Sequence, residues 1–147
     1  MRVNQILSAK RTDIVYVAPS ASIGTAVGLM TNEHVGAVLV LDQDGGLVGV
    51  ISERDVVHGL ASDPAGLLNR AVIEIVRKDG PVTALQDTVQ SVMEVMTATR
   101  TRHVPVVQHG RVVGIVSIGD IVKSRLDEKT QENAVLQEIA RAQFFAR

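Results

Sequence analysis

The residues whose types could do chemistry come in two serine–aspartate pairs. Ser52 precedes Asp55 by three positions, and Ser117 precedes Asp120 by the same spacing. Each pair joins an apolar run to a helical pattern, so the aspartate falls in the first turn of a helix. A carboxylate held there can accept two charge-assisted hydrogen bonds from a cis-diol, each contributing roughly 1.5–3 kcal/mol, and the free amides of a helix start can bind phosphate oxygens. Plain helix capping is the alternative interpretation.

The two pairs belong to a longer internal repeat. The segment 49–57 returns at 114–122 with glycine, serine and aspartate in register, and the segment 19–31 matches 85–97. The repeat covers about 1–60 and 70–126. Each copy is too short for a core of ordinary domain size, whereas two copies packed together give one typical domain. Duplication therefore predicts a pseudo-symmetric body that carries its sites in pairs at the seam between copies.

The same series of elements is predicted for each copy. A short helix (2–8 and 70–77) leads to an extended segment (13–17 and 81–84) and then to an amphipathic helix capped by Ser22 or by Asp87–Thr88. Two apolar strands follow (37–41 and 47–51; 104–107 and 112–116), each pair joined by a glycine-containing turn, and the Ser-x-x-Asp helix comes last. Residues 58–70 are interpreted as the connection between the copies.

A long helix is predicted from about 120 to the end of the chain. Its apolar stripe contains Val135, Leu136, Ile139, Ala140 and Phe144 on a charged background. Such a stripe must pack on something, and either an intramolecular or a dimer contact fits better than a membrane surface, because the polar face carries charges of both signs.

Composition excludes several classes of function. The 147 residues carry a formal net charge of −1 and only 2% aromatic residues, which argues against general attraction to nucleic acid or anionic membranes and against base-stacking platforms. The absence of cysteine excludes disulfides, thiol catalysis and zinc–thiolate sites. No signal peptide, membrane-length apolar run or metal-binding histidine spacing is visible, so a cytoplasmic protein is expected.

The repeated Gly-apolar-apolar-Ser-x-x-Asp motif, with its amphipathic helix and paired strands, resembles the cystathionine-β-synthase (CBS) domain. Two copies in one chain are similar to a Bateman module of the stand-alone bacterial type. The resemblance implies an α/β fold: two tandem βαββα repeats, 1–65 and 66–126, packed sheet to sheet with pseudo-twofold symmetry, and a helical tail at 127–147. It also implies two ligand clefts between the repeats.

In modules of this kind the ligand is usually an adenine nucleotide. The resemblance implies that the aspartate binds the ribose hydroxyls, that the serine lies near phosphate, and that adenine lodges against the extended segment and first strand of the other copy. AMP is the expected regulatory ligand, with ADP, ATP, NADH or S-adenosylmethionine as alternatives, and no cofactor is required. Carried over by position, the first cleft would use Ser52, Arg54, Asp55, Val82, Thr83, Arg102, His103 and Val104.

The second cleft would use Val15, Tyr16, Gly36, Ala37, Ser117 and Asp120. It departs from the family pattern, because its basic residue is at most His34 and Gly119 stands where the first copy has Arg54. Arg102 can make a bidentate phosphate contact in the first cleft. We therefore expect the first cleft to bind phosphate more strongly than the second.

Three functions remain to be compared. The leading hypothesis is a non-catalytic regulatory module that binds an adenosine-containing molecule, forms a homodimer and signals to an unknown effector protein. An enzyme is the second, although the repeated carboxylates lack a neighbouring base or nucleophile in the sequence. The third is a structural or nucleic-acid-binding protein with empty clefts.

Overall fold

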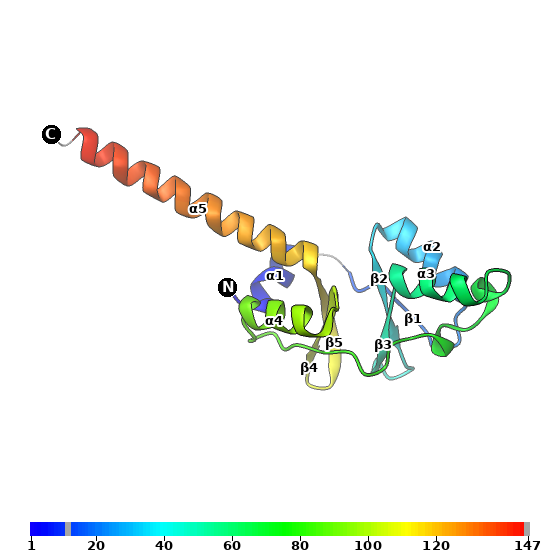
Figure 1. The fold of residues 1–147 in the computed structure, drawn as a ribbon. Coiled ribbons are helices and arrows are strands. Elements are labelled where there is room, and N and C mark those ends of the chain that lie inside the picture. Colours follow the sequence, from blue (N-terminus) through cyan, green and yellow to red (C-terminus); the bar gives the residue numbers. More distant parts are fainter. Residues whose placement is uncertain (11–12, 146–147) are drawn as a thin grey trace.

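The computed structural model describes residues 1–10 and 13–145, which fold into two α/β lobes lying side by side (Figure 1). The first lobe contains β1 (Tyr16–Val17), α2 (Ile23–Glu33), β2 (Ala37–Leu41), β3 (Leu47–Ser52) and α3 (Glu53–Ser62). The second lobe contains α1 (Val3–Lys10), α4 (Val89–Thr99), β4 (His103–Gln108), β5 (Arg111–Ser117) and the start of α5 (Ile118–Phe145). Two 3₁₀ turns, η1 (Leu67–Asn69) and η2 (Val72–Glu74), lie in the segment between α3 and α4.

The two sheets repeat one pairing scheme. In the first lobe β1 pairs in parallel with β2, and β2 pairs antiparallel with β3. In the second lobe β4 and β5 form the antiparallel pair, and a single parallel bridge from Thr83 to Val106 takes the place of the β1–β2 contact. Leu39, Leu41 and Val112 form a buried apolar cluster between the sheets. The α/β fold with sheet-to-sheet packing is thus confirmed.

Local signals place the helices where the sequence predicts them. The Ser22 hydroxyl accepts a hydrogen bond from the Thr25 amide, and the Thr88 hydroxyl accepts one from the Ser91 amide, so α2 and α4 begin with equivalent caps. Each helix buries one apolar face at helical spacing, with Ile23, Ala26 and Met30 in α2 and Val89, Val92 and Met96 in α4.

The leading segments of the two copies are exchanged between the lobes. Val3 and Ile6 of α1 lie in the core of the second lobe, whereas Val72 and Val76 lie in the core of the first. The predicted helix at 70–77 is absent apart from η2, because backbone groups on either side of this turn pair with the first lobe: Ala71 bridges to Ser22 and Arg77 bridges to Val50. The exchange ties the repeats into one body.

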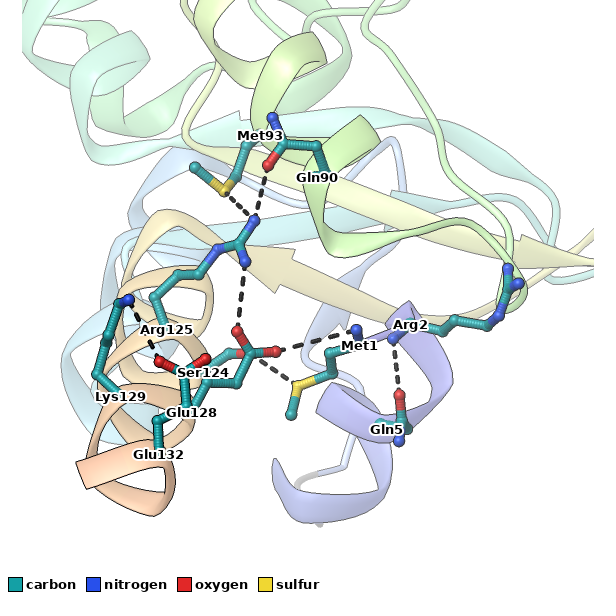
Figure 2. A network of polar contacts seen from close by, with 10 residues as sticks. All are labelled: Met1, Arg2, Gln5, Gln90, Met93, Ser124, Arg125, Glu128, Lys129 and Glu132. Carbon is teal, nitrogen blue, oxygen red and sulfur yellow. Dashed lines mark hydrogen bonds and ion pairs between the residues drawn. The ribbon is translucent and has the colours of Figure 1, made fainter. Parts of the chain in front are cut away.

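α5 begins in the second lobe and extends far beyond it (Figure 1). Its base is held by contacts drawn in Figure 2: Arg125 donates a hydrogen bond to Gln90 of α4 at 2.7 Å, the N-terminal ammonium of Met1 lies 3.9 Å from Glu128, and the Ser124 hydroxyl lies 2.7 Å from the sulfur of Met1. From residue 129 to residue 144 every side chain is exposed.

The apolar stripe on the outer part of α5 therefore lies open to solvent. Leu136 is 62% exposed and Ile139 is 48% exposed, so intramolecular packing does not cover them. Of the two contacts expected for this stripe, only the dimer contact remains as a prediction for these two residues.

Candidate functional site

Three reciprocal hydrogen bonds between Ser52 and Asp55 cap the start of α3. The Ser52 hydroxyl accepts from the Asp55 amide at 3.2 Å, and Asp55 Oδ2 accepts from the Ser52 amide at 2.8 Å and from the Ser52 hydroxyl at 2.9 Å. The capping interpretation is therefore correct for one carboxylate oxygen. The other oxygen, Oδ1, accepts no hydrogen bond from any residue that the structure describes, so capping leaves room for a ligand contact.

A first cleft, formed by both repeats, lies at this helix start. Ser52, Arg54 and Asp55 line it from the first repeat, and Arg102 and His103 line it from the second. These five residues were assigned to one cleft from the sequence, and the structure brings them together. The other residues along its wall are Gly36, Val50, Glu53, Arg77, Gly80, Pro81, Arg100, Thr101 and Pro105.

Three residues assigned to this cleft lie elsewhere. Val104 is fully buried in the second core, and the Thr83 hydroxyl is occupied by a 2.7 Å hydrogen bond that it donates to Asp87. Val82 is half exposed and does not line the cavity; Pro81 does so instead. Any contact of these three residues with a ligand stays a prediction.

His103 lies between the two clefts and lines both. Its Nε2 atom is 3.2 Å from the place where a side chain on Gly36 would begin, so the absence of a side chain at Gly36 makes room for the ring. Burial lowers the pKa of His103 below its ordinary value of 6.5; Lys10 and Arg102 lower it further, while the carboxylates of Glu53 and Asp120 oppose this shift.

The second cleft contains a lysine that the sequence did not reveal. Lys10, the last residue of α1, places its ammonium 2.9 Å from Asp120 Oδ2 and 3.0 Å from the carbonyl oxygen of Ile115. Asp120 Oδ2 also accepts from the Ser117 amide at 2.9 Å, which repeats the cap of α3. The expectation that His34 is the only basic residue here is therefore wrong, because the exchanged helix α1 delivers a second one.

The two clefts differ in charge. Four arginines and two carboxylates line the first, a formal excess of two positive charges with histidine neutral. Lys10 and three carboxylates, those of Asp13, Glu33 and Asp120, line the second, a formal excess of two negative charges. Of the residues assigned to the second cleft, only Tyr16 lies elsewhere: it is 57% exposed and lines a separate concavity beside the β2–β3 turn. Val15, Gly36, Ala37, Ser117 and Asp120 all line the second cleft.

Comparison with protein families accounts for the repeat. The model of the CBS domain matches the chain twice, at residues 3–62 and 72–127. The chain belongs to the CBS-domain family. Each matched segment contains one Ser-x-x-Asp pair, so the tandem CBS domains coincide with the internal repeat. The CBS model describes a domain found in regulatory proteins and indicates no catalytic family.

Relatives of known sequence include protein YlbB of Bacillus subtilis, which is 30% identical over 135 residues that cover 90% of this chain and 87% of YlbB. The mitochondrial CBS domain-containing protein CBSX3 of Arabidopsis thaliana is 32% identical over 120 residues. That match covers 76% of this chain and 58% of CBSX3, so the plant protein contains further sequence.

Solved structures share the arrangement of the lobes. A CBS-domain-containing protein from Agrobacterium tumefaciens is 41% identical with a TM-score of 0.79, and the match covers 84% of this chain and 98% of that one. CBSX2, solved in complex with AMP, is 23% identical with a TM-score of 0.72 and coverages of 87% and 98%. No helix in the described part of the chain combines the length and apolarity needed to cross a membrane.

Proposed function

We propose that this protein is a non-catalytic regulatory module that binds an adenine nucleotide in the first cleft. The observation that carries the proposal is the meeting of a half-bonded carboxylate, Asp55, with Arg102 and His103 from the other CBS domain in one cavity. A nucleotide needs both groups, a carboxylate for its ribose hydroxyls and cations for its phosphate.

AMP carries the three groups that Asp55, Arg102 and the apolar wall of the first cleft would bind: a ribose, a phosphate and an adenine. In this proposal Asp55 Oδ1 accepts hydrogen bonds from the ribose hydroxyls, the α3 amides and Arg102 bind the phosphate, and adenine lies against the apolar wall near Val50, Pro81 and Pro105. The AMP complex of CBSX2 supports the ligand class through a shared fold. NADH and S-adenosylmethionine are alternatives that a ligand screen would distinguish.

The second cleft is assigned a weaker role. Its aspartate already holds the ammonium of Lys10, and its excess of carboxylates repels phosphate. We therefore infer that one nucleotide binds per chain, and that it binds in the first cleft.

Signalling requires a partner. We propose a cytoplasmic homodimer that contacts an effector protein, with the exposed stripe of α5 as the surface that joins two copies. The exposure of Leu136 and Ile139 supports this arrangement, because a helix extending alone into water gains little stability from its own hydrogen bonds.

A thermal-shift screen tests the ligand class. A ligand that binds only the folded state raises stability by RT ln(1 + [L]/Kd), about 2.7 kcal/mol at a hundredfold excess over Kd. We expect AMP and other adenine nucleotides to raise the melting temperature, with guanosine and cytidine nucleotides as controls. No shift with any adenine compound, combined with retardation of RNA or DNA in a gel, would favour the nucleic-acid-binding alternative; turnover of a nucleotide would favour an enzyme.

A further inference from the structure

Four arginines from separate segments line the first cleft. Arg54 lies in the first turn of α3, Arg77 between η2 and α4 near the start of the second CBS domain, Arg100 at the end of α4 and Arg102 just before β4. Within the described residues none of their guanidinium groups makes an ion pair or a hydrogen bond, whereas Arg70 and Arg125 elsewhere do both. All four side chains are exposed along the wall of one cavity, where an anion that carries several charges can contact more than one of them.

The fold fixes the backbone of Arg77 at the cleft. Its amide donates to the Val50 carbonyl at 3.2 Å, and its carbonyl accepts from the Val50 amide at 3.3 Å. Gly49 permits this approach, because a side chain there would begin 2.3 Å from the Arg77 carbonyl oxygen. Arg77 is thus attached to β3, next to the start of α3.

Arg100 occupies a backbone conformation that favours glycine. It caps α4 with φ 53° and ψ 36°, and its amide donates to the Met96 carbonyl. Glycine adopts this left-handed conformation without the steric cost that a side chain imposes. Arginine at a strained position on a cavity wall points to a role for its side chain.

Few cationic side chains are needed to bind one phosphate group. A single arginine contacts two phosphate oxygens in bidentate fashion, so Arg102 with His103 and the α3 amides suffices for a monophosphate. We propose that Arg77 and Arg100 are specificity-determining residues that select ligands with two or three linked phosphates over monophosphates. This proposal rests on the proposed function in one respect, that the nucleoside is adenosine. The arginines would recognise the phosphate chain whichever nucleoside carries it.

Isothermal calorimetry at constant ionic strength, without divalent cations, tests the selectivity with two ligand series. The first series is adenosine, AMP, ADP and ATP, and the second is inorganic phosphate, pyrophosphate and triphosphate. For the wild type we expect affinity to rise at least tenfold from AMP to ATP. Arg77→Gln and Arg100→Gly should each weaken ATP about tenfold, AMP less than twofold and adenosine not at all.

Arg100→Gly also separates binding from folding. Relief of the left-handed strain leaves the melting temperature of the free protein unchanged or raises it, so weaker ATP binding in this variant cannot come from misfolding. His109→Gly is the matched control: His109 has φ 52° in the β4–β5 turn, outside both clefts, and its replacement should leave ATP affinity unchanged.

Equal affinity of the wild type for AMP and ATP would overturn the selectivity, as would an ATP-to-AMP ratio that neither arginine variant changes. Failure of the proposed function looks different. If adenosine and AMP fail to bind while triphosphate binds more tightly than phosphate and loses affinity in both variants, the arginine assignment stands and the adenine assignment falls.

Discussion

Replacement of Asp55 by alanine separates the two roles of this carboxylate. The variant loses the hydrogen bonds that Asp55 Oδ2 accepts from Ser52, which are one half of the capping box. The Ser52 hydroxyl still accepts from the amide of residue 55, so we expect a loss of about 1 kcal/mol of folding stability. In the proposed complex it also loses two hydrogen bonds from ribose hydroxyls. At the low end of the range for charged acceptors this amounts to about 3 kcal/mol, or roughly 150-fold weaker nucleotide binding.

Asp120→Ala is the matched control, because Asp120 makes the same cap with Ser117 in the other CBS domain. It additionally loses the ion pair with Lys10, so its folding stability should fall at least as far as that of Asp55→Ala. Its AMP affinity should stay within about twofold of the wild type, since the first cleft is intact. Urea denaturation gives the stabilities and calorimetry gives the affinities.

The ligand supplies a second control. For the wild type, removal of both ribose hydroxyls from AMP should weaken binding about as much as removal of the Asp55 carboxylate does, and the two losses should not add. Additive losses would show that Asp55 and the ribose do not meet. Equal weakening of AMP by the Asp55 and Asp120 variants would refute the assignment of the nucleotide to the first cleft.

Three further predictions concern the second cleft, the shared histidine and the long helix. Lys10→Ala should remove the ammonium that lies against Asp120 in the second cleft and raise the stoichiometry of adenosine binding from one to two per chain in calorimetry; an unchanged value of one would contradict the blocking role of Lys10. The partly buried imidazole of His103 binds a proton less readily than the same side chain in the unfolded protein, so the free energy of unfolding should fall as the pH drops below 6.5. His103→Gln should reduce this pH dependence; identical slopes in urea titrations from pH 5 to pH 8 would contradict it. Leu136→Glu should lower the mass measured by light scattering from dimer to monomer, while Ala134→Glu, on the opposite side of α5, should not; equal masses would exclude the stripe as the dimer contact.

Features encoded over a few residues could be predicted from the sequence. The caps at Ser22 and Thr88 and the apolar strands on either side of the Gly45 turn depend on neighbouring side chains, and the structure has them where the pattern places them. The Ser-x-x-Asp helix starts follow the same logic. Repetition then predicted the paired lobes, because each unit is too small to fold alone.

Features that depend on long-range packing could not be predicted in this way. Lys10 reaches Asp120 only because α1 packs on the second lobe, 110 positions away along the chain. The predicted helix at 70–77 fails because Arg77 pairs with β3, which no local pattern reveals. That pairing also brings Arg77 to the first cleft. Helical spacing predicted α4, but it did not indicate that the capping residue Arg100 would line the first cleft as well.

Native mass spectrometry of the protein mixed with an equimolar set of nucleotides tests the central claim most directly. The measurement counts bound molecules and identifies them by mass. We predict one adenine nucleotide per chain for the wild type and none for Asp55→Ala under the same conditions. A wild-type protein that binds no adenine nucleotide, or a variant that retains it fully, would contradict a nucleotide site at the junction of the two CBS domains.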